Sequence, residues 1–372
     1  IPKLDQGIVE QGERVFRLSI SAGRKEFAPG VVSPTIGVNA PYLGPTLEMR
    51  RGERVRLHVD NGLDEGATVH WHGFELPAAA DGGPHQLIRP GARWSPSFEV
   101  RQRASLYWYH SHLHRGTGPQ VYAGLAAPIY VRDDEEDALD LPSEYGVDDI
   151  PLIVQDRLLD NSGKLLYPHN MHAQMMGVRG DRIYVNGTHN AVFDARTGLL
   201  RLRILNGSNA RFYDFSLSRG QTMQIIASDG GFLAAPVTVD SVSLSVGERV
   251  EILVDVSDKK VIQLQSQQSG GGGMMMGMMG GGSGSGAFTI MTIDARQAPT
   301  SSNAIPTNLR AMSAIPDPKA AIETRKFDLQ MGMGMMSGGF KINGQSMEMS
   351  RIDFQVKRNS TEIWEVRNDS PM

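Results

Sequence analysis

The stretch VNAPYLGPTLEMRRGERVRLHVDNG, Val38–Gly62, contains the pattern that decides the fold. It opens with a Val-Asn strand end, continues through a loop, and closes on a second strand that ends at Asn61. Apolar and polar residues alternate through Val55–Val59, and a period of two indicates a half-buried strand. The segments RVFRLSI and RVEILVDVSD, which begin at Arg14 and Arg249, alternate in the same way. Short half-buried strands are therefore predicted throughout.

The same pattern occurs twice more, as VNGTHNAVFDARTGLLRLRILNGS (Val185–Ser208) and INGQSMEMSRIDFQVKRNSTEIWEVRNDS (Ile342–Ser370). Each copy opens with Val-Asn or Ile-Asn and closes its second strand on an asparagine. The opening asparagines are Asn39, Asn186 and Asn343, and the closing ones are Asn61, Asn206 and Asn368. The copies lie about one domain apart, and such a period predicts tandem repeats of one structural unit.

The predicted fold is all-β, with tandem Greek-key β-sandwiches of which two are complete and a third is incomplete. The expected domains cover residues 1–133, 145–294 and 322–372. The acidic segment 132–149 and the Pro-, Ser- and Asn-rich segment 294–309 are the expected linkers. The third piece is too short for a sandwich, which needs about 100 residues.

Composition excludes several classes of function. The 372 residues carry 37 basic and 41 acidic side chains, and a net charge of −4 gives no reason to expect a nucleic-acid or membrane-surface partner. No stretch approaches the roughly 20 apolar residues of a membrane span. The chain begins at Ile1 without a basic-then-apolar leader, so we expect any signal peptide to be already removed or never present. With no cysteine, these residues form no disulfide, thiolate zinc site or cysteine nucleophile.

Five of the ten histidines lie in two short runs. ATVHWHGFEL contains His70 and His72, and LYWYHSHLHRG contains His110, His112 and His114. Residues two apart on a strand point to the same face, so two neighbouring strands would form one wall of imidazoles. Neutral imidazole binds zinc, copper, iron and nickel, and several imidazoles without thiolate or carboxylate favour copper or zinc.

The alternative interpretation is structural. A single H-x-H pair is often a solvated or hydrogen-bonded strand face, whereas two such runs in one repeat copy favour a metal site. The neighbouring aromatic residues fit either a buried site or a plain core; they are Trp71, Tyr107, Trp108 and Tyr109. The second copy has Phe215 at the offset that His70 has in the first, so we expect the second domain to lack metal ligands.

Several segments together resemble three-domain bacterial multicopper oxidases of the laccase and cuprous-oxidase type. They are HWHGFELPAAADGGP, YWYHSHLHRGTGPQVYAGLAAPIYV, IPLIVQDR, LRLRILNGSNARFYDFSL and IIASDGGFL, in the family's order and through nearly all of the chain. The resemblance implies cupredoxin-like sandwiches, bound copper and a periplasmic or secreted location. It also implies one-electron oxidation of a reducing substrate, Cu(I) or a phenol, coupled to four-electron reduction of O2 to water.

The resemblance assigns a role to each histidine by position. His70 resembles a ligand of the type 2 copper. His72, His110 and His112 resemble ligands of the type 3 pair. His114 matches a histidine of the motif that is usually not a ligand.

The resemblance also singles out Asp81, in ADGGP. It resembles the carboxylate that assists proton delivery to reduced oxygen, and a carboxylate near cationic metal stays ionised and can relay protons. The other interpretation is a turn residue before Gly82.

The family's remaining ligands lie in its last domain, in an H-P-x-H-x-H run and an H-C-H-x-x-x-H run followed by Met. This chain stops at NDSPM, Asn368–Met372, where the first of those runs would begin, and it has no cysteine for a type 1 copper. We therefore expect this chain alone to be an incomplete oxidase, whose missing C-terminal segment belongs to the same protein.

Methionine is abundant, with 19 residues, and two clusters stand out. SGGGGMMMGMMGGGSGSG (Ser269–Gly286) lies in a loop of the second copy, and MGMGMM (Met331–Met336) precedes the third. Thioethers are soft ligands that suit Cu(I), whereas the alternative is a flexible insertion with apolar contacts. The possible Cu(I) contacts are Met274, Met275, Met276, Met278, Met279, Met331, Met333, Met335 and Met336.

Other functions compete with a copper-dependent oxidase. A catalytically inactive multicopper-oxidase-like scaffold of the cell envelope would keep the fold, but such scaffolds lose the H-x-H runs that this chain has. A two-domain laccase or a cupredoxin nitrite reductase is disfavoured by the three repeat copies. Within the oxidase hypothesis, the methionine clusters favour Cu(I) over phenols as the substrate.

Overall fold

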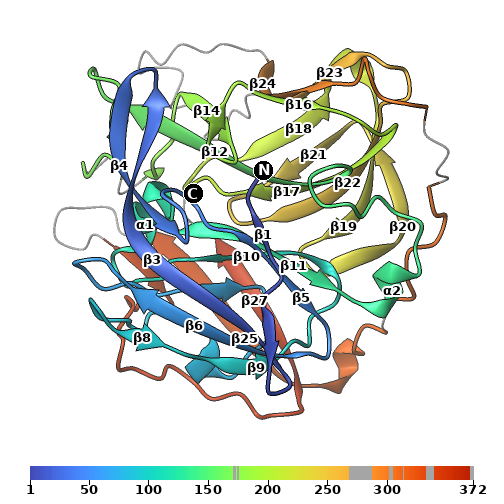
Figure 1. Cartoon of the computed structure of the whole chain (residues 1–372). Helices are drawn as coiled ribbons and strands as arrows, with labels where there is room; N and C mark the ends of the chain where they lie inside the picture. Colours follow the sequence, from blue (N-terminus) through green and yellow to red (C-terminus); the bar gives the residue numbers. More distant parts are fainter. Residues whose placement is uncertain are drawn as a thin grey trace. The chain divides into compact units, whose positions relative to one another are not determined.

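A computed structural model gives the fold of the chain (Figure 1). It describes residues 1–170, 173, 176–267, 287–300, 305–312, 314–331 and 339–368. The described residues form two compact units, one up to Arg310 and one from Ala311 onward. Strands dominate both, so the predicted all-β class is confirmed.

The first two sheets contain only strands from the N-terminal third of the chain. One sheet has the order β1-β5-β11-β10-β7; the other has the order β2-β3-β6-β8, with β4 paired to β3 and β9 paired to β6. The strands are β1 (Leu4–Asp5), β2 (Ile8–Glu10), β3 (Glu13–Ala28), β4 (Val31–Val38), β5 (Thr46–Arg50), β6 (Arg54–Asn61), β7 (His70–His72), β8 (Arg93–Trp94), β9 (Ser97–Glu99), β10 (Ser105–His110) and β11 (Ala126–Arg132).

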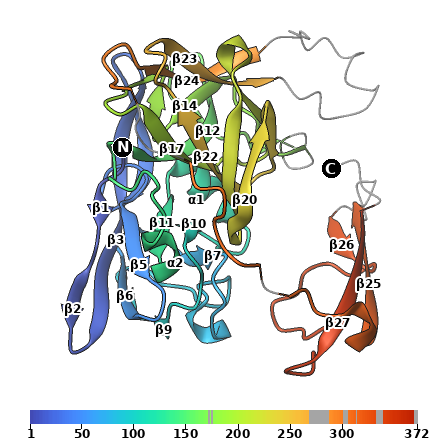
Figure 2. The same cartoon turned by 90° about the vertical axis from the view of Figure 1, so that its right-hand side faces the viewer.

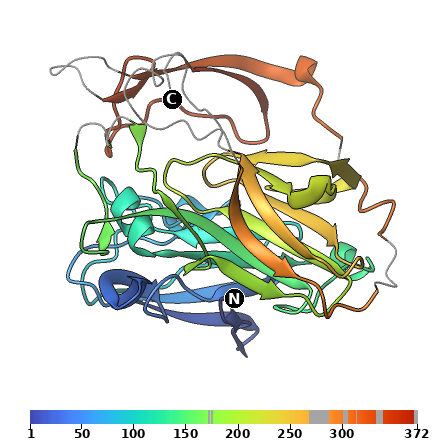
Figure 3. The same cartoon turned by 90° about the horizontal axis from the view of Figure 1, so that it is seen from above.

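The next two sheets form the second sandwich of the same unit. Their orders are β15-β14-β12-β17-β22-β19-β20, with β13 on β12, and β16-β24-β23-β18-β21. The strands are β12 (Asp149–Leu159), β13 (Leu165–Leu166), β14 (Arg182–Val185), β15 (Thr188–His189), β16 (Ala191–Asp194), β17 (Leu199–Asn206), β18 (Tyr213–Leu217), β19 (Met223–Ser228), β20 (Gly231–Val239), β21 (Ser241–Leu244), β22 (Arg249–Asp255), β23 (Val261–Gln267) and β24 (Ala287–Asp294). Figures 1 and 3 show the two pairs of sheets side by side, blue to teal and green to orange.

Helices are few and short among the described residues. They are α1 (Thr117–Ala123), α2 (Asp134–Asp137) and the 3-10 turns η1 (Ala78–Ala80), η2 (Ser218–Gly220) and η4 (Pro318–Ala320). None of the helices in the described residues is long and apolar enough to cross a membrane.

The alternation of apolar residues is reproduced on β3 and β6. Phe16, Leu18 and Ile20 of β3 are buried, while Arg17 and Ser19 between them are exposed. These apolar side chains and their counterparts on β6 pack into one core with side chains of the facing sheet. Each fully buried aliphatic or aromatic side chain contributes about 1.5–3 kcal/mol, which makes this core the main source of stability in the first sandwich.

The prediction of a half-buried strand is wrong for β22. All of its residues except the last are buried, including the charged Arg249 and Glu251. Its apolar face lies in the core of the second sandwich, through Val250 and Ile252. The charged face is covered by the first sandwich, where Glu251 accepts a hydrogen bond from the backbone of Leu106.

The opening asparagine of each copy adopts the same conformation. Asn39, Asn186 and Asn343 have φ angles of 52°, 51° and 52°, in the left-handed region that asparagine tolerates better than most residues. The side chain of Asn39 accepts from the backbone N–H of Ser19 and donates to the carbonyl of Arg17. The other two form the same pair of bonds, so the repeat seen in the sequence is a repeat of one strand-bridging contact.

The second unit is a single sheet with the order β26-β25-β27, drawn in red and orange in Figure 2. Its strands are β25 (Ala321–Met331), β26 (Phe340–Ile342) and β27 (Thr361–Asn368). Phe327, Phe354 and Trp364 pack together on it, yet Trp364 remains 53% exposed. Within the described residues this piece therefore has one sheet and no second layer over its apolar side chains.

A cluster of buried charges joins the two sandwiches of the first unit. Arg203 of β17 binds Glu136 of α2, Asp149 of β12 and Glu251 of β22, and Arg201 binds Glu136 and Glu251. All five side chains are at most 5% exposed. Removing one partner of such a cluster leaves a buried charge unpaired and costs about 3–5 kcal/mol.

This cluster predicts a loss of stability in acid. Burial alone would raise the pKa of Glu136, but the guanidiniums of Arg201, Arg203 and Arg132 hold it at about 2, below the ordinary value of 4.5. The pKa of Glu136 is lower in the folded protein than in the unfolded chain. The ionised carboxylate therefore stabilises the folded state above pH 4.5, and this stabilisation is lost as the pH falls toward 2. Glu136 thus contributes about 3 kcal/mol to the pH dependence of the unfolding free energy, measured by chemical denaturation.

The variant Glu136→Gln is expected to be less stable at pH 6 and to lose less stability between pH 5 and pH 2.5 than the parent. Glu10→Gln serves as the control, because the ion pair of Glu10 with Arg17 lies in solvent. The same acid dependence in the parent and in Glu136→Gln would contradict the assignment.

Candidate metal centre

The first histidine run and the first histidine of the second run lie on adjacent antiparallel strands. His70 is paired with His110, Trp71 with Tyr109, and His72 with Trp108, on β7 and β10. Because side chains alternate along a strand, this register brings His70, His72 and His110 to one face of the sheet. The fourth member of that face is Trp108, whose ring stacks on His110 with centroids 4.0 Å apart.

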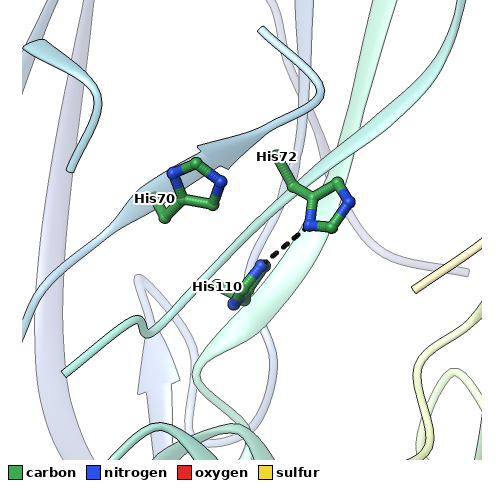
Figure 4. A group of neighbouring side chains, drawn as sticks. All are labelled: His70, His72 and His110. Atoms are coloured by element: carbon green, nitrogen blue, oxygen red, sulfur yellow. Dashed lines mark hydrogen bonds between the residues drawn. The ribbon is translucent and has the colours of Figure 1, made fainter. Parts of the chain in front are cut away.

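The three imidazoles converge closely enough to share a metal site. One ring nitrogen of each of His70, His72 and His110 lies within 4.8 Å of the others. Figure 4 shows His72 and His110 pointing toward one another, with 3.1 Å between Nδ1 of His72 and Nε2 of His110. This group was predicted from the sequence, and the structure brings three of its members together.

Backbone carbonyls fix which nitrogen is available on two of these rings. Nδ1 of His70 donates to the carbonyl oxygen of Asp81 at 2.9 Å, and Nδ1 of His110 donates to the carbonyl of Ser111 at 2.8 Å. A carbonyl oxygen only accepts, so each Nδ1 carries the proton and each Nε2 keeps its lone pair. A second hydrogen bond of this kind orients most metal-binding histidines.

Burial keeps two of the rings neutral. It lowers the pKa of His72 to about 4, with further contributions from Arg249 and the neighbouring histidines. Burial also lowers the pKa of His110 well below its ordinary value. At neutral pH both imidazoles are therefore uncharged, and neutral imidazole is the form that binds metal.

His112 and His114 depart from the sequence prediction. The expectation that they continue along the strand of His110 is wrong, because β10 ends at His110. The chain turns there: the amide of Ser111 bonds to Leu125, and the amide of His112 bonds to the hydroxyl of Thr68. His112 is exposed, with its ring centroid 5.3 Å from that of His70, and it lies beside the group of three.

The donor set and its spacing fit a transition metal. Two nitrogens bound to one ion at 2.0–2.1 Å in tetrahedral geometry stand about 3.3 Å apart, close to the 3.1 Å between His72 and His110. Three imidazoles without thiolate match copper and zinc equally well. The residues present therefore fit a bound copper ion.

Asp81 lies beside His70 and also forms a turn. Its carboxylate Oδ2 is 3.3 Å from Nδ1 of His70, and its side chain is 36% exposed. It caps η1 and precedes Gly82, whose φ of 74° is left-handed. The turn interpretation is confirmed at this position, and the role in proton delivery stays a prediction.

Residues of the second sandwich also reach the cluster, and sequence reasoning missed them. A Cβ on Gly247 would lie 3.5 Å from His72 and 3.5 Å from Trp108, so the β21–β22 turn packs against both rings. Arg249 donates to the carbonyl of Leu106, on the strand that carries His110. In the sequence, Arg249 and Glu251 are charged residues at alternate positions of a strand. That pattern normally indicates a solvated face, so it did not mark them as part of the site.

The other predicted residues have different outcomes. Phe215, which occupies the position in the second copy that corresponds to His70, lies fully buried in the core. The second sandwich therefore has an apolar core residue at this position. Met331 ends β25 of the second unit. The remaining methionines fall outside the described residues; they are Met274, Met275, Met276, Met278, Met279, Met333, Met335 and Met336.

Comparisons with known proteins find similar sequences and structures. Family models described as multicopper oxidase match residues 20–136 and residues 153–263. The multicopper oxidase mco of Staphylococcus aureus is 33% identical over 367 residues, which is 99% of this chain and 72% of that protein. The cell division protein FtsP of Escherichia coli K12 is 33% identical over 362 residues, 97% of this chain and 74% of that protein.

Among solved structures, the laccase-like multicopper oxidase CueO from Ochrobactrum sp. superposes with a TM-score of 0.87. It is 35% identical, and the match covers 99% of this chain and 82% of that chain. That protein is described as an oxidase of lignin model compounds and lignosulfonate. The predicted cupredoxin-like fold is thereby confirmed.

The close approach at Gly82 gives a test of the site's geometry. A Cβ there would lie 1.7 Å from the carbonyl oxygen of Val69, the residue before His70. Gly30 has the same φ of 74° but nothing within 4 Å of its Cβ position, which makes it a matched control. Gly30→Ala is expected to cost about 1–2 kcal/mol of unfolding free energy from backbone strain alone.

Gly82→Ala is expected to cost at least about 2 kcal/mol more, because the loop of Asp81 must move away from Val69. That movement also breaks the hydrogen bond to His70, so metal content should fall in this variant alone. Denaturation curves and metal analysis measure both effects. Equal losses of unfolding free energy in Gly30→Ala and Gly82→Ala would show that Gly82 does not lie close to the carbonyl of Val69.

Proposed function

The chain belongs to the multicopper oxidase family, and from this premise we propose that it contributes a copper-binding wall to an O2-reducing oxidase. The reaction couples one-electron oxidation of a reducing substrate to four-electron reduction of O2 to water. Family membership implies copper and an oxidoreductase class. The assignment of individual ligands, the substrate and a periplasmic or secreted location are parts of the proposal.

One observation carries the proposal: three imidazole nitrogens lie within 4.8 Å of one another on two paired strands. In a histidine cluster with only a structural role, the lone pairs of the rings need not face a common point. Here the carbonyls of Asp81 and Ser111 hold the protons on the far side of two rings. His72 and His110 share a hydrogen bond of 3.1 Å, and two nitrogens bound to one metal ion have nearly the same separation.

Each residue has a proposed role toward copper. His72 and His110 hold one ion of the type 3 pair through the two nitrogens that face each other, and His112, at the open edge, belongs to the second ion of that pair. His70 holds the type 2 ion through Nε2. When bound, copper supplies the one-electron steps that O2 reduction needs. No cysteine occurs in the 372 residues, so they do not provide the thiolate of a type 1 copper.

Asp81 is proposed to hold and pass protons at its Oδ2. The carboxylate contacts His70 and is partly open to solvent, so a proton can reach it without crossing the core. Reduction of O2 to water consumes four protons, and a carboxylate at the edge of a metal site is suited to deliver them. The backbone of the same residue orients His70, which links proton delivery to ligand position.

The reducing substrate is either Cu(I) or a phenol. The methionine clusters 269–286 and 331–336 support Cu(I), since thioethers suit that ion. The structural relative from Ochrobactrum acts on lignin model compounds, which supports a laccase-type substrate.

A second candidate function is a cell-envelope scaffold without catalysis. The similarity to the cell division protein FtsP over 97% of this chain favours it. The convergent histidines oppose it, because a scaffold has no need of a metal wall. Copper binding by the purified protein separates the two.

Alanine variants of the ligands provide the first test. His72→Ala and His110→Ala should each weaken copper binding by more than the 10–100-fold expected for an outer partner, and should abolish O2 consumption by the oxidase to which this wall contributes. His58→Ala is the control, since His58 lies on β6, where its ring hydrogen-bonds to the hydroxyl of Ser95, and is not a member of the cluster. Copper is measured by atomic absorption after dialysis. Unchanged copper content in both cluster variants, or a parent that takes up no copper, would favour the scaffold.

The methionine cluster provides the second test. Replacing Met274, Met275, Met276, Met278 and Met279 by Leu removes the sulfur but keeps the apolar character and the length of the segment. If these residues collect Cu(I), kcat/KM for Cu(I) should fall at least about tenfold, while kcat/KM for a phenol stays the same. O2 uptake measures both rates. Activity toward phenols alone, unaffected by the replacement, would contradict the Cu(I) assignment.

A further inference from the structure

The strand that carries His110 is only partly paired on one side. β10 pairs with β7 at Trp108, Tyr109 and His110, but not at Leu106. β7 ends at His72 because Gly73, with a φ of 89°, turns the chain away. The N–H and C=O of Leu106 on that side therefore have no strand beside them.

Two charged side chains of β22 occupy the place of the missing strand. Glu251 accepts from the N–H of Leu106 at 2.8 Å, and Nε of Arg249 donates to its C=O at 3.2 Å. The two residues lie at alternate positions of β22 and so project from the same face. They satisfy both backbone groups of one residue, as a neighbouring strand would.

Both side chains are themselves rigidly held. Arg249 also donates to the carbonyls of Gly247 and Asp229 and pairs with the carboxylate of Asp229 at 2.7 Å. Glu251 is fixed by Arg201 and Arg203 in the buried charge cluster. Side chains with this many partners have few alternative rotamers.

The same face of β22 confines His72. A Cβ on Gly73 would lie 3.0 Å from Nη2 of Arg249, so the guanidinium lies directly under the residue that follows His72. Gly247, two residues before Arg249, packs its backbone against the rings of His72 and Trp108. β22 thus contacts both strands of the histidine wall.

We infer that Arg249 and Glu251 are positioning residues for the metal site: they fix β10 against β7 and so set the separation of His72 and His110. The sandwich that carries no ligands thereby determines the geometry of the ligands on its neighbour. This inference rests on the proposed function, because it concerns the copper that these histidines would hold.

The test compares three variants of the copper-loaded protein. Arg249→Met removes the hydrogen bonds to Leu106 and Gly247 but leaves Asp229 in contact with solvent, at 46% exposure of its side chain. Arg249→Lys keeps the positive charge but lacks the planar guanidinium, whose several N–H groups donate in fixed directions. Arg211→Met is the matched control: Arg211 pairs with the buried Asp156 and the carbonyl of Gly180, and neither of these residues lies on β7 or β10.

Copper affinity is measured by competition with a chelator, and the copper–nitrogen distances by X-ray absorption spectroscopy. Arg249→Met should raise the copper dissociation constant 10–100-fold and change the X-ray absorption spectrum. Arg249→Lys should give a smaller change in the same direction, and Arg211→Met should match the parent in both measurements.

Two results would overturn the inference. One is an Arg249→Met variant that matches Arg211→Met in affinity and spectrum. The other, which applies if Arg249→Met does not fold, is an Arg249→Lys variant indistinguishable from the parent. Failure of the proposed function would look different, since the parent itself would then bind no copper.

Discussion

The architecture depends on an asparagine that bridges two strands from a left-handed conformation. At Asn39, Asn186 and Asn343 the side-chain amide accepts from one backbone N–H and donates to a carbonyl two residues earlier on the neighbouring strand. Few residues tolerate this φ, and the asparagine amide offers both a donor and an acceptor on a short side chain. In each copy the contact ties the end of one strand (β4, β14 or β26) to the strand paired with it (β3, β12 or β25).

Buried charge determines how the two sandwiches of the first unit meet. Ion pairs such as those of Arg203 with Glu136 and Asp149 add little net stability compared with apolar packing, because each charge must lose its water. Their contribution is directional, since each guanidinium needs acceptors at fixed angles. Glu251 belongs to this cluster and also binds the backbone of β10, so the interface that joins the sandwiches reaches the strand of His110.

The proposed metal centre has a more buried side and a more exposed side. His72 and His110 are packed against Trp108 and are neutral because burial disfavours their charged form. His112 and Asp81 lie on the side that is exposed to solvent, which can supply protons and further ligands. Such a division suits a site that must hold metal firmly on one side and exchange small molecules on the other.

The sequence by itself determined the strands of β3 and β6, the three repeat copies and the pairing of His70 with His72 on one face. These features follow from local periods, and a period of two leaves only one way for alternate side chains to point. Only the tertiary structure decided that β10 ends at His110, that His70 lies opposite it, and that Arg249 and Glu251 are buried against Leu106. Register and the burial of charge depend on which surfaces meet, and residues far apart in the chain decide that jointly.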